Sequence, residues 1–276
     1  MLPDPPADGP GPARPEAPVR ALATGLAVLR SFTPGRPALT VSSAAEAAGI
    51  TRATARRVLH TLVHEGFAVQ EGREFRLTPR VLELGHGYWT GTSLAELLRP
   101  VLARASQALE QSCSAAVLDG AFLLYIARVH TERIIRVNLD VGTRLPAFLT
   151  SMGRVLLADL PPAAARRLLQ GTPRTPRTPE TVTDVAALLA ELARVREQDH
   201  AVVTAELDPH LSSVAVPVRG PDGAVVAAIN TALPHRSPGA AGPSAAEQTR
   251  AAVDAALPVL REAARDAEDA LVALRR

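Results

Sequence analysis

Apolar residues recur at helical spacing in three successive segments that follow a proline-rich start. Residues 1–18 hold little to bury, so we expect a disordered leader there. From Val19 to Phe32 an apolar residue returns every three or four positions, until the prolines of TPGRP end the pattern. Thr40 and Thr51 then stand where each can cap a short helix. The later of these two helices carries one apolar stripe, formed by Ala55, Val58, Leu59, Leu62 and Val63.

The hydrophobic period then changes from that of a helix to that of a strand. Apolar and polar residues alternate on both sides of a turn at EGR, which predicts a β-hairpin with the apolar set Phe67, Val69, Phe75 and Leu77. Three helices followed by a hairpin is the order of a winged helix-turn-helix. We therefore predict such a domain over residues 19–80, followed by a linker helix over residues 81–93.

The second half of the chain, residues 94–276, mixes both periods. Helical patterns lie at residues 94–111, 152–159, 161–170, 183–198 and 244–274. Strand-like runs are AAVLDG, FLLYIARV, RIIRVNLD, AVVTAEL, LSSVAVPVRG and AVVAAINTAL. Strands flanked by helices at both ends indicate an α+β domain on a mostly antiparallel sheet, with the last helix covering one face.

Composition excludes several classes of protein. The chain has 276 residues, of which 47% are apolar and 21% charged, as in ordinary globular proteins. Its apolar runs are far shorter than the ~18–20 residues that cross a bilayer, so no membrane contact is expected. The single cysteine, Cys113, cannot form an intrachain disulfide, which fits a cytoplasmic location.

Positive charge is concentrated in the first predicted domain. Residues 20–80 contain nine arginines and four glutamates, an excess of five positive charges, so the remainder of this +2 chain carries about three negative ones. Such asymmetry suggests that the basic part faces a polyanion. A helix fits the major groove of DNA and reads base edges there. The candidate contacts on the third helix are Thr51, Arg52, Thr54, Arg56, Arg57 and His60, and those on the hairpin are Arg73 and Arg76. The alternative is a solvated helix with ordinary surface arginines.

Several stretches resemble the IclR family of bacterial transcriptional regulators. They are SFTPGRPALTVSSAAEAAGITRATARRVLHTLVHEGFA, FRLTPRVLELG, VGTRLPAFLTSMGRVLLADLPP and AELDPHLSSVAVPVRGPDGAVVAAIN, and the resemblance covers nearly all of residues 19–235. SCSAAVLDG and TSMGRVLLA further resemble the subgroup that regulates β-ketoadipate pathway genes for protocatechuate or 4-hydroxybenzoate breakdown. Ser43, where many relatives have an acidic capping residue, and FLL at residues 122–124 depart from the family pattern.

This resemblance implies a GAF-like effector-binding domain, a homodimer or homotetramer, and promoter control by a small carboxylic or aromatic acid, with activation favoured. The loop GTRLPAFLTSMG precedes a helix start that Thr150 or Ser151 would cap, and free amides there suit a carboxylate. Alignment with the family's pocket and this loop give the candidate effector contacts Arg144, Leu145, Leu149, Thr150, Ser151, Met152, Gly153, Asp208, Ser213 and Asn230. Any one of them can instead be a plain cap or core filler.

We interpret the chain as an effector-responsive regulator that binds double-stranded promoter DNA, with RNA polymerase as a further partner and no cofactor. Alternatives are a ligand sensor whose first domain docks another protein, and a repressor of a different catabolic pathway. An enzyme using Cys113 as nucleophile lacks an activating motif. His60 and His64 have the spacing of a metal pair but no evident third ligand, so no metal site is expected.

Overall fold

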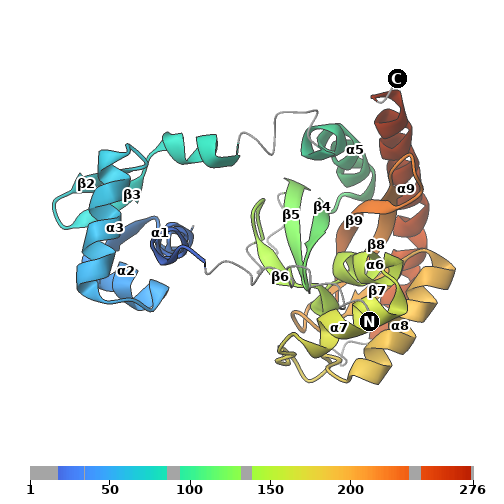
Figure 1. Cartoon of the computed structure of the whole chain (residues 1–276). Coiled ribbons are helices and arrows are strands. Elements are labelled where there is room, and N and C mark those ends of the chain that lie inside the picture. The colour runs from blue at the N-terminus through green and yellow to red at the C-terminus, as the bar shows by residue number, and fades with distance from the viewer. Residues whose placement is uncertain (1–17, 34, 86–93, 132–138, 236–243, 275–276) are drawn as a thin grey trace, which may run out of the picture. The chain divides into compact units, whose positions relative to one another are not determined.

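Two compact units make up the structure, a computed structural model. It describes residues 18–33, 35–85, 94–131, 139–235 and 244–274. The first unit spans residues 1–90 and the second residues 91–276 (Figure 1). The expected leader, except for its last residue, and residues 86–93 of the expected linker helix lie outside the described residues. The expected domain boundaries at residues 80 and 93 stay predictions.

The first unit has the expected order of three helices followed by a hairpin. Its elements are α1 (Arg20–Ser31), β1 (Ala38–Thr40), α2 (Val41–Ala48), α3 (Arg52–His64), β2 (Ala68–Glu71), β3 (Glu74–Leu77) and the 3-10 helix η1 (Pro79–Leu82). The strands form an antiparallel sheet in the order β1-β3-β2. The winged helix-turn-helix is therefore confirmed. Strand β1 was not predicted, because three residues are too few to show alternation.

Side-chain caps fix the start of α2 and α3. The Thr40 hydroxyl accepts a hydrogen bond from the Ser43 amide, and the Ser43 hydroxyl accepts one from the Thr40 amide at 2.9 Å, which together form a capping box. Ser43 thus completes the capping box at the position where the family pattern has an acidic residue. Gly49, with φ of 64°, ends α2 in the left-handed conformation that favours glycine. Thr51 caps α3 by accepting from the Thr54 amide.

The hairpin corrects one expectation about which residues face inward. Val69 is 43% exposed, whereas Ala68 is buried. Val69 lies opposite Arg76, and residues directly opposite on paired strands share a face. The inward face is therefore the one that carries Ala68 and Phe75, and the strand begins one residue later than the alternation of Phe67 and Val69 suggested.

The second unit is the expected α+β domain on an antiparallel sheet. Its six strands are ordered β6-β5-β4-β9-β8-β7, and every neighbouring pair is antiparallel. Its elements are α5 (Leu94–Leu109), β4 (Cys113–Asp119), β5 (Phe122–Val129), β6 (Arg144–Pro146), η2 (Ala147–Leu149), α6 (Ser151–Asp159), α7 (Pro162–Gln170), α8 (Val185–Gln198), β7 (Ala201–Thr204), β8 (Leu211–Arg219), β9 (Val225–Pro234) and α9 (Ala245–Ala273). Most of the predicted run RIIRVNLD lies outside the described residues.

Helices cover both faces of this sheet (Figure 1). α5 and α9 pack on one face, as predicted for the last helix, and α6 packs on the other face with α7 and α8 outside it. Every residue from Ser151 to Ala158 is buried, because α6 lies between the sheet and α8. This explains why TSMGRVLLA has only one charged residue, Arg154.

Two glycines make a matched test of this packing. A Cβ added at Gly153 in α6 would overlap the backbone of Ala147, whereas one added at Gly25 in α1 would meet nothing within 4 Å. We expect Gly153→Ala to lower the free energy of unfolding by ~1–3 kcal/mol through overpacking. Gly25→Ala should raise it by up to ~1 kcal/mol, because alanine is the better helix former. Urea unfolding followed by circular dichroism measures both. A neutral Gly153→Ala would contradict the close packing of α6 on η2.

Candidate functional site

The exposed face of α3 carries arginines whose charges are unpaired within the described residues. Arg52, Arg56 and Arg57 are all exposed, and none lies within ion-pair distance of a described carboxylate. The hydroxyl groups of Thr51 and Thr54 are hydrogen-bonded to each other at 2.9 Å at the helix start. Guanidinium groups that remain free in water are available to phosphates and to guanine edges.

The rest of the predicted DNA contacts differ in their surroundings. His60 is exposed, but its ring packs edge-on against Phe75 of the core, with 5.7 Å between ring centroids. Arg73 is exposed in the turn of the hairpin. Arg76 forms ion pairs with Glu71 at 3.3 Å and Glu74 at 3.5 Å, which neutralise part of its charge. All these DNA contacts stay predictions. Among the arginines, Arg76 is the least favourable candidate, because part of its charge is already neutralised.

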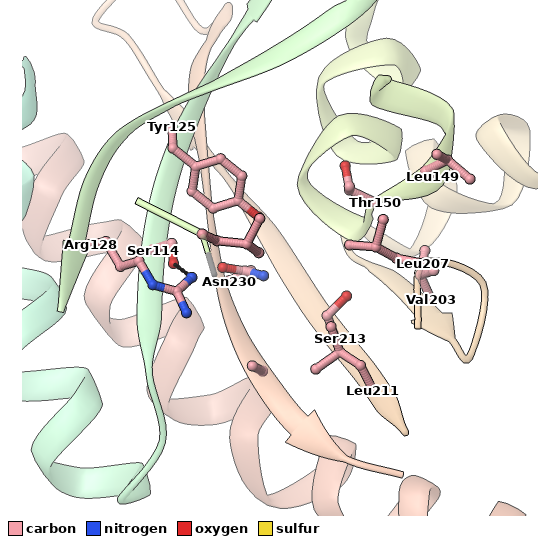
Figure 2. A pocket seen from close by; sticks show the side chains of 12 residues that line it. Ser114, Tyr125, Arg128, Leu149, Thr150, Val203, Leu207, Leu211, Ser213 and Asn230 are labelled. Atoms are coloured by element: carbon pink, nitrogen blue, oxygen red, sulfur yellow. Dashed lines mark hydrogen bonds between the residues drawn. The ribbon is translucent and has the colours of Figure 1, made fainter. Parts of the chain in front are cut away.

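The second unit contains a cavity between the sheet and the start of α6 (Figure 2). Its lining residues surround about 520 Å³ of space, part of which is open solvent. The floor comes from β4, β5, β7, β8 and β9. Its lining residues are Ser114, Tyr125, Arg128, Leu139, Leu149, Thr150, Val203, Leu207, Leu211, Ser213, Asn230 and Ala232.

The register of the sheet places three polar side chains side by side on the floor. Arg128 of β5 lies opposite Ser114 of β4, and Ser114 lies opposite Asn230 of β9. One Arg128 Nη donates a hydrogen bond to Ser114 Oγ at 3.0 Å (Figure 2). We refer to Arg128, Ser114 and Asn230 as the polar row.

A β-bulge brings Tyr125 onto the same face as the polar row. Residues three apart on a regular strand point to opposite faces, since side chains alternate with period two. The register of β5 against β4 shifts at Ala115 and Ala116, so that Ile126 is the extra residue between Tyr125 and Ala127. Both Tyr125 and Arg128 therefore line the cavity. Bulges commonly redirect side chains next to functional sites.

The cavity holds a partly desolvated positive charge. Burial lowers the pKa of the Arg128 guanidinium, and the charge of Asp140 partly offsets this shift. The Asp140 carboxylate is itself hydrogen-bonded to His130 Nε2 at 3.0 Å. Among the described residues, no carboxylate lies within ion-pair distance of Arg128. A guanidinium with this much burial and no paired anion favours binding an anion from outside.

The roof of the cavity is fixed by a buried ion pair. Arg154 of α6 donates to Glu206 Oε2 at 2.7 Å and to the Phe148 carbonyl at 3.0 Å, and both charged side chains are almost fully buried. The same Glu206 oxygen accepts from the Val182 amide. The pair thus joins the segment that carries Leu149 and Thr150 to the segment that carries Leu207.

Of the ten predicted effector contacts, the structure brings four together in the cavity: Leu149, Thr150, Ser213 and Asn230. Thr150, not Ser151, caps α6 by accepting from the Gly153 amide at 3.0 Å.

The other six predicted contacts are absent from the cavity lining. Arg144 is exposed, pairs with Asp119 at 2.8 Å and stacks over the Phe122 ring, so its charge is already compensated. Asp208 accepts from the His210 amide in a turn. The remaining four pack in the core on β6 and α6, where they are Leu145, Ser151, Met152 and Gly153.

Sequence reasoning missed Arg128, although a signal was present. It is the only charged residue in the apolar strand FLLYIARV. The missed apolar lining, Val203, Leu207 and Leu211, comes from β7, from the segment after it and from the start of β8.

Cys113 has the environment of a structural thiol. It precedes Ser114 on β4 and is fully buried, and burial raises the pKa of its thiol to about 11. The described residues hold no group of three or more metal-binding side chains. Within the same ranges, every helix is too short or too polar to span a bilayer.

Comparison with known proteins agrees with the division of the chain into these two units. Residues 21–72 match the IclR helix-turn-helix domain, and residues 86–265 match the C-terminal domain of IclR-type bacterial transcriptional regulators. The chain belongs to the IclR family. It is thus a DNA-binding transcriptional regulator. Helix α3 and strand β2 lie within the matched helix-turn-helix segment, and strand β3 follows it directly.

Two relatives within the family are named as regulators of the Pca regulon and of p-hydroxybenzoate hydroxylase. The Pca regulon regulatory protein of Pseudomonas putida is 41% identical over 76% of this chain and 72% of its own length. The p-hydroxybenzoate hydroxylase transcriptional activator of Acinetobacter baylyi is 31% identical over 77% and 80%. The structure is similar to that of an IclR homologue from Microbacterium hydrocarbonoxydans in complex with 4-hydroxybenzoate, with a TM-score of 0.77 and 27% identity over 92% of this chain and 99% of the other.

Arg57 provides the sharpest test of the DNA-binding face. If it contacts guanine with two hydrogen bonds, Arg57→Ala should weaken specific binding by ~1–3 kcal/mol and relax discrimination at one base pair. Arg166→Ala makes the same charge change on an exposed residue of the second unit and should leave binding unchanged. Fluorescence anisotropy with operator variants measures both. An equal loss on every sequence would make Arg57 a phosphate contact.

The raised pKa of Cys113 predicts an unreactive thiol. At pH 8 the folded protein should resist alkylation by iodoacetamide, because the reactive thiolate is almost absent and the thiol is buried. In denaturant the same thiol should react completely, which mass spectrometry detects. Rapid modification of the native protein would show that Cys113 is accessible and activated.

Proposed function

We propose that the protein activates genes for the breakdown of aromatic acids of the β-ketoadipate type, and that a small aromatic carboxylic acid in the cavity controls this activity. The observation that carries the proposal is Arg128, which is partly desolvated, has no carboxylate partner among the described residues, and lines a cavity that also has leucine and valine side chains. Such a site suits a molecule with an anionic group and an apolar ring. The names of the relatives support both the aromatic substrate class and activation.

We further propose that the protein acts as a homodimer or homotetramer on repeated half-sites, as helix-turn-helix dimers do. Apolar side chains of the first unit support this proposal, because α1 leaves Leu22 65% exposed and Leu26 41% exposed. Contiguous exposed apolar residues commonly mark an interface. Activation would involve contact with RNA polymerase, and the site of action would be the cytoplasm.

An acid bound to the second unit changes DNA binding only if its affinity differs between two arrangements of the protein. The Arg154–Glu206 pair offers a route for this difference, since it joins the two segments of the cavity roof. A ligand that moves Leu149 or Leu207 would therefore strain or relieve a buried, fully paired contact.

A mobility-shift titration with the DNA upstream of the protein's own gene tests the proposed function. Binding should fall steeply with salt, because phosphate contacts release counterions. 4-Hydroxybenzoate or 3,4-dihydroxybenzoate at millimolar concentration should change the affinity or raise transcription in vitro, whereas hexanoate, which lacks a ring, should do neither. Binding that is insensitive to salt would favour a protein-docking role for the first unit. DNA binding and transcription unaffected by all aromatic acids would contradict the proposed effector class.

A further inference from the structure

Three consecutive carbonyl groups at the end of α3 accept hydrogen bonds from the residues that follow the hairpin. The Thr78 hydroxyl donates to the Gly66 carbonyl at 2.6 Å, and the Thr78 amide donates to the Phe67 carbonyl at 3.0 Å. One Arg80 Nη donates to the Glu65 carbonyl at 2.9 Å. Carbonyl groups at the end of a helix have no partner within it, so here Thr78 and Arg80 supply the donors. We refer to this set of three hydrogen bonds as the clasp.

Arg80 also holds the start of η1. Its guanidinium carbon lies 5.4 Å from the centre of the Phe67 ring, within the range of cation–π attraction. Its Nε forms an ion pair with Glu83, directly after η1, at 3.2 Å. Thr78 is the residue just before η1 begins. The clasp therefore fastens the chain that leads on to the second unit to the C-terminal end of α3.

The clasp fixes geometry more than it adds stability. The side chains of Arg80 and Glu83 are more than half exposed, and exposed ion pairs of this kind contribute little to the free energy of unfolding. Water can also satisfy carbonyl groups at the surface. The hydrogen bonds of the two side chains, however, join positions 12 and 15 residues apart in the chain. Because of them, α3 cannot rotate relative to η1 without breaking the clasp.

The predicted DNA contacts on α3 lie toward its other end. Arg52, Thr54 and Arg57 all precede Glu65 by eight residues or more, which is ~12 Å along the helix axis. A short helix turns as one rod, so a small rotation at its C-terminal end displaces these side chains. Base-edge contacts depend on bidentate geometry, whereas the phosphate contribution is electrostatic and independent of sequence. The clasp therefore bears on sequence discrimination more than on overall affinity.

We infer that the clasp positions α3 on DNA and passes movements of the linker on to it, with Thr78 and Arg80 as positioning residues. The inference rests on the proposed function, because such movements would start in the second unit when an effector binds. It adds the end of the route that lies in the first unit. The competing interpretation is that Arg80 binds a DNA phosphate, as exposed arginines of DNA-binding domains commonly do.

Fluorescence anisotropy on the full-length protein separates these two roles. It compares the affinity for the DNA upstream of the protein's own gene with that for a scrambled duplex, over a range of salt concentrations. Arg80→Met should lower the ratio of the two affinities about threefold or more, the size expected for one lost hydrogen bond, and leave the salt dependence unchanged. Loss of a phosphate contact would instead weaken both complexes equally and lower the salt slope by about one. Arg20→Met makes the same charge change at an exposed residue of α1 and should leave the ratio unchanged.

A second pair of variants tests the clasp without changing any charge. Thr78→Val removes the hydroxyl that donates to the Gly66 carbonyl and keeps the Thr78 amide. It should lower the affinity ratio in the same direction as Arg80→Met, whereas Thr78→Ser, which keeps the hydroxyl, should retain the wild-type ratio. Thermal unfolding confirms that each variant is folded. A lower unfolding temperature with an unchanged ratio would make the clasp an ordinary helix cap and overturn the inference.

The effector response tests the transmission of movement. By isothermal titration calorimetry, Arg80→Met and Thr78→Val should bind 4-hydroxybenzoate as the wild type does. The change that this acid causes in DNA affinity or in transcription should nevertheless be smaller in both variants than in the wild type. A full response in both variants would overturn the role of the clasp in transmission and leave the proposed function in place. If no aromatic acid binds to the wild type, the proposed function fails, and the affinity ratio still decides whether the clasp positions α3.

Discussion

The effector-binding unit depends on a positive charge that the fold partly removes from water. Arg128 stands on the floor of a cavity with polar and apolar lining, where burial lowers its pKa and no described carboxylate pairs with it. A protein maintains such a group only if its surroundings hold it in place and some benefit offsets the cost of desolvation. Here the surroundings are the neighbouring strands, and we propose that binding an anion provides the benefit.

Backbone geometry places this charge, so the site is largely preformed. The antiparallel register sets Arg128, Ser114 and Asn230 side by side, and the bulge in β5 adds Tyr125 to the same face. Above them, the Arg154–Glu206 pair ties together the two segments that bring apolar side chains to the cavity. The floor is a hydrogen-bonded sheet and the roof is built from connecting segments, so we expect a ligand that fills the cavity to act mainly on the roof.

The two units use arginine in opposite ways. On α3, Arg52, Arg56 and Arg57 are exposed and unpaired among the described residues, so their guanidinium groups are in contact with water and accessible to a polyanion. In the cavity, Arg128 is partly dehydrated. This favours the binding of a single small anion whose geometry matches the guanidinium group. A chain whose net charge is only +2 thus carries two distinct sets of arginines that have no carboxylate partner among the described residues.

Local patterns predicted the helices well, because caps and apolar stripes act over a few residues. Thr40, Thr51 and the α3 stripe were all read correctly from the sequence. Strand faces were harder, and Val69 was misassigned because cross-strand register, not alternation alone, decides which side is buried. The cavity was predicted only in part. The loop before α6 suggested Thr150 and Arg144, and Arg128 was missed. Only tertiary structure shows that Arg144 already pairs with Asp119.

A crystal structure of the protein with bound 4-hydroxybenzoate tests the central claim most directly. The account predicts the carboxylate within hydrogen-bond distance of the Arg128 guanidinium and the ring against the leucines of the roof. An acid bound at Arg144 or at the exposed end of another helix, with the cavity above Arg128 filled only by water, would contradict it.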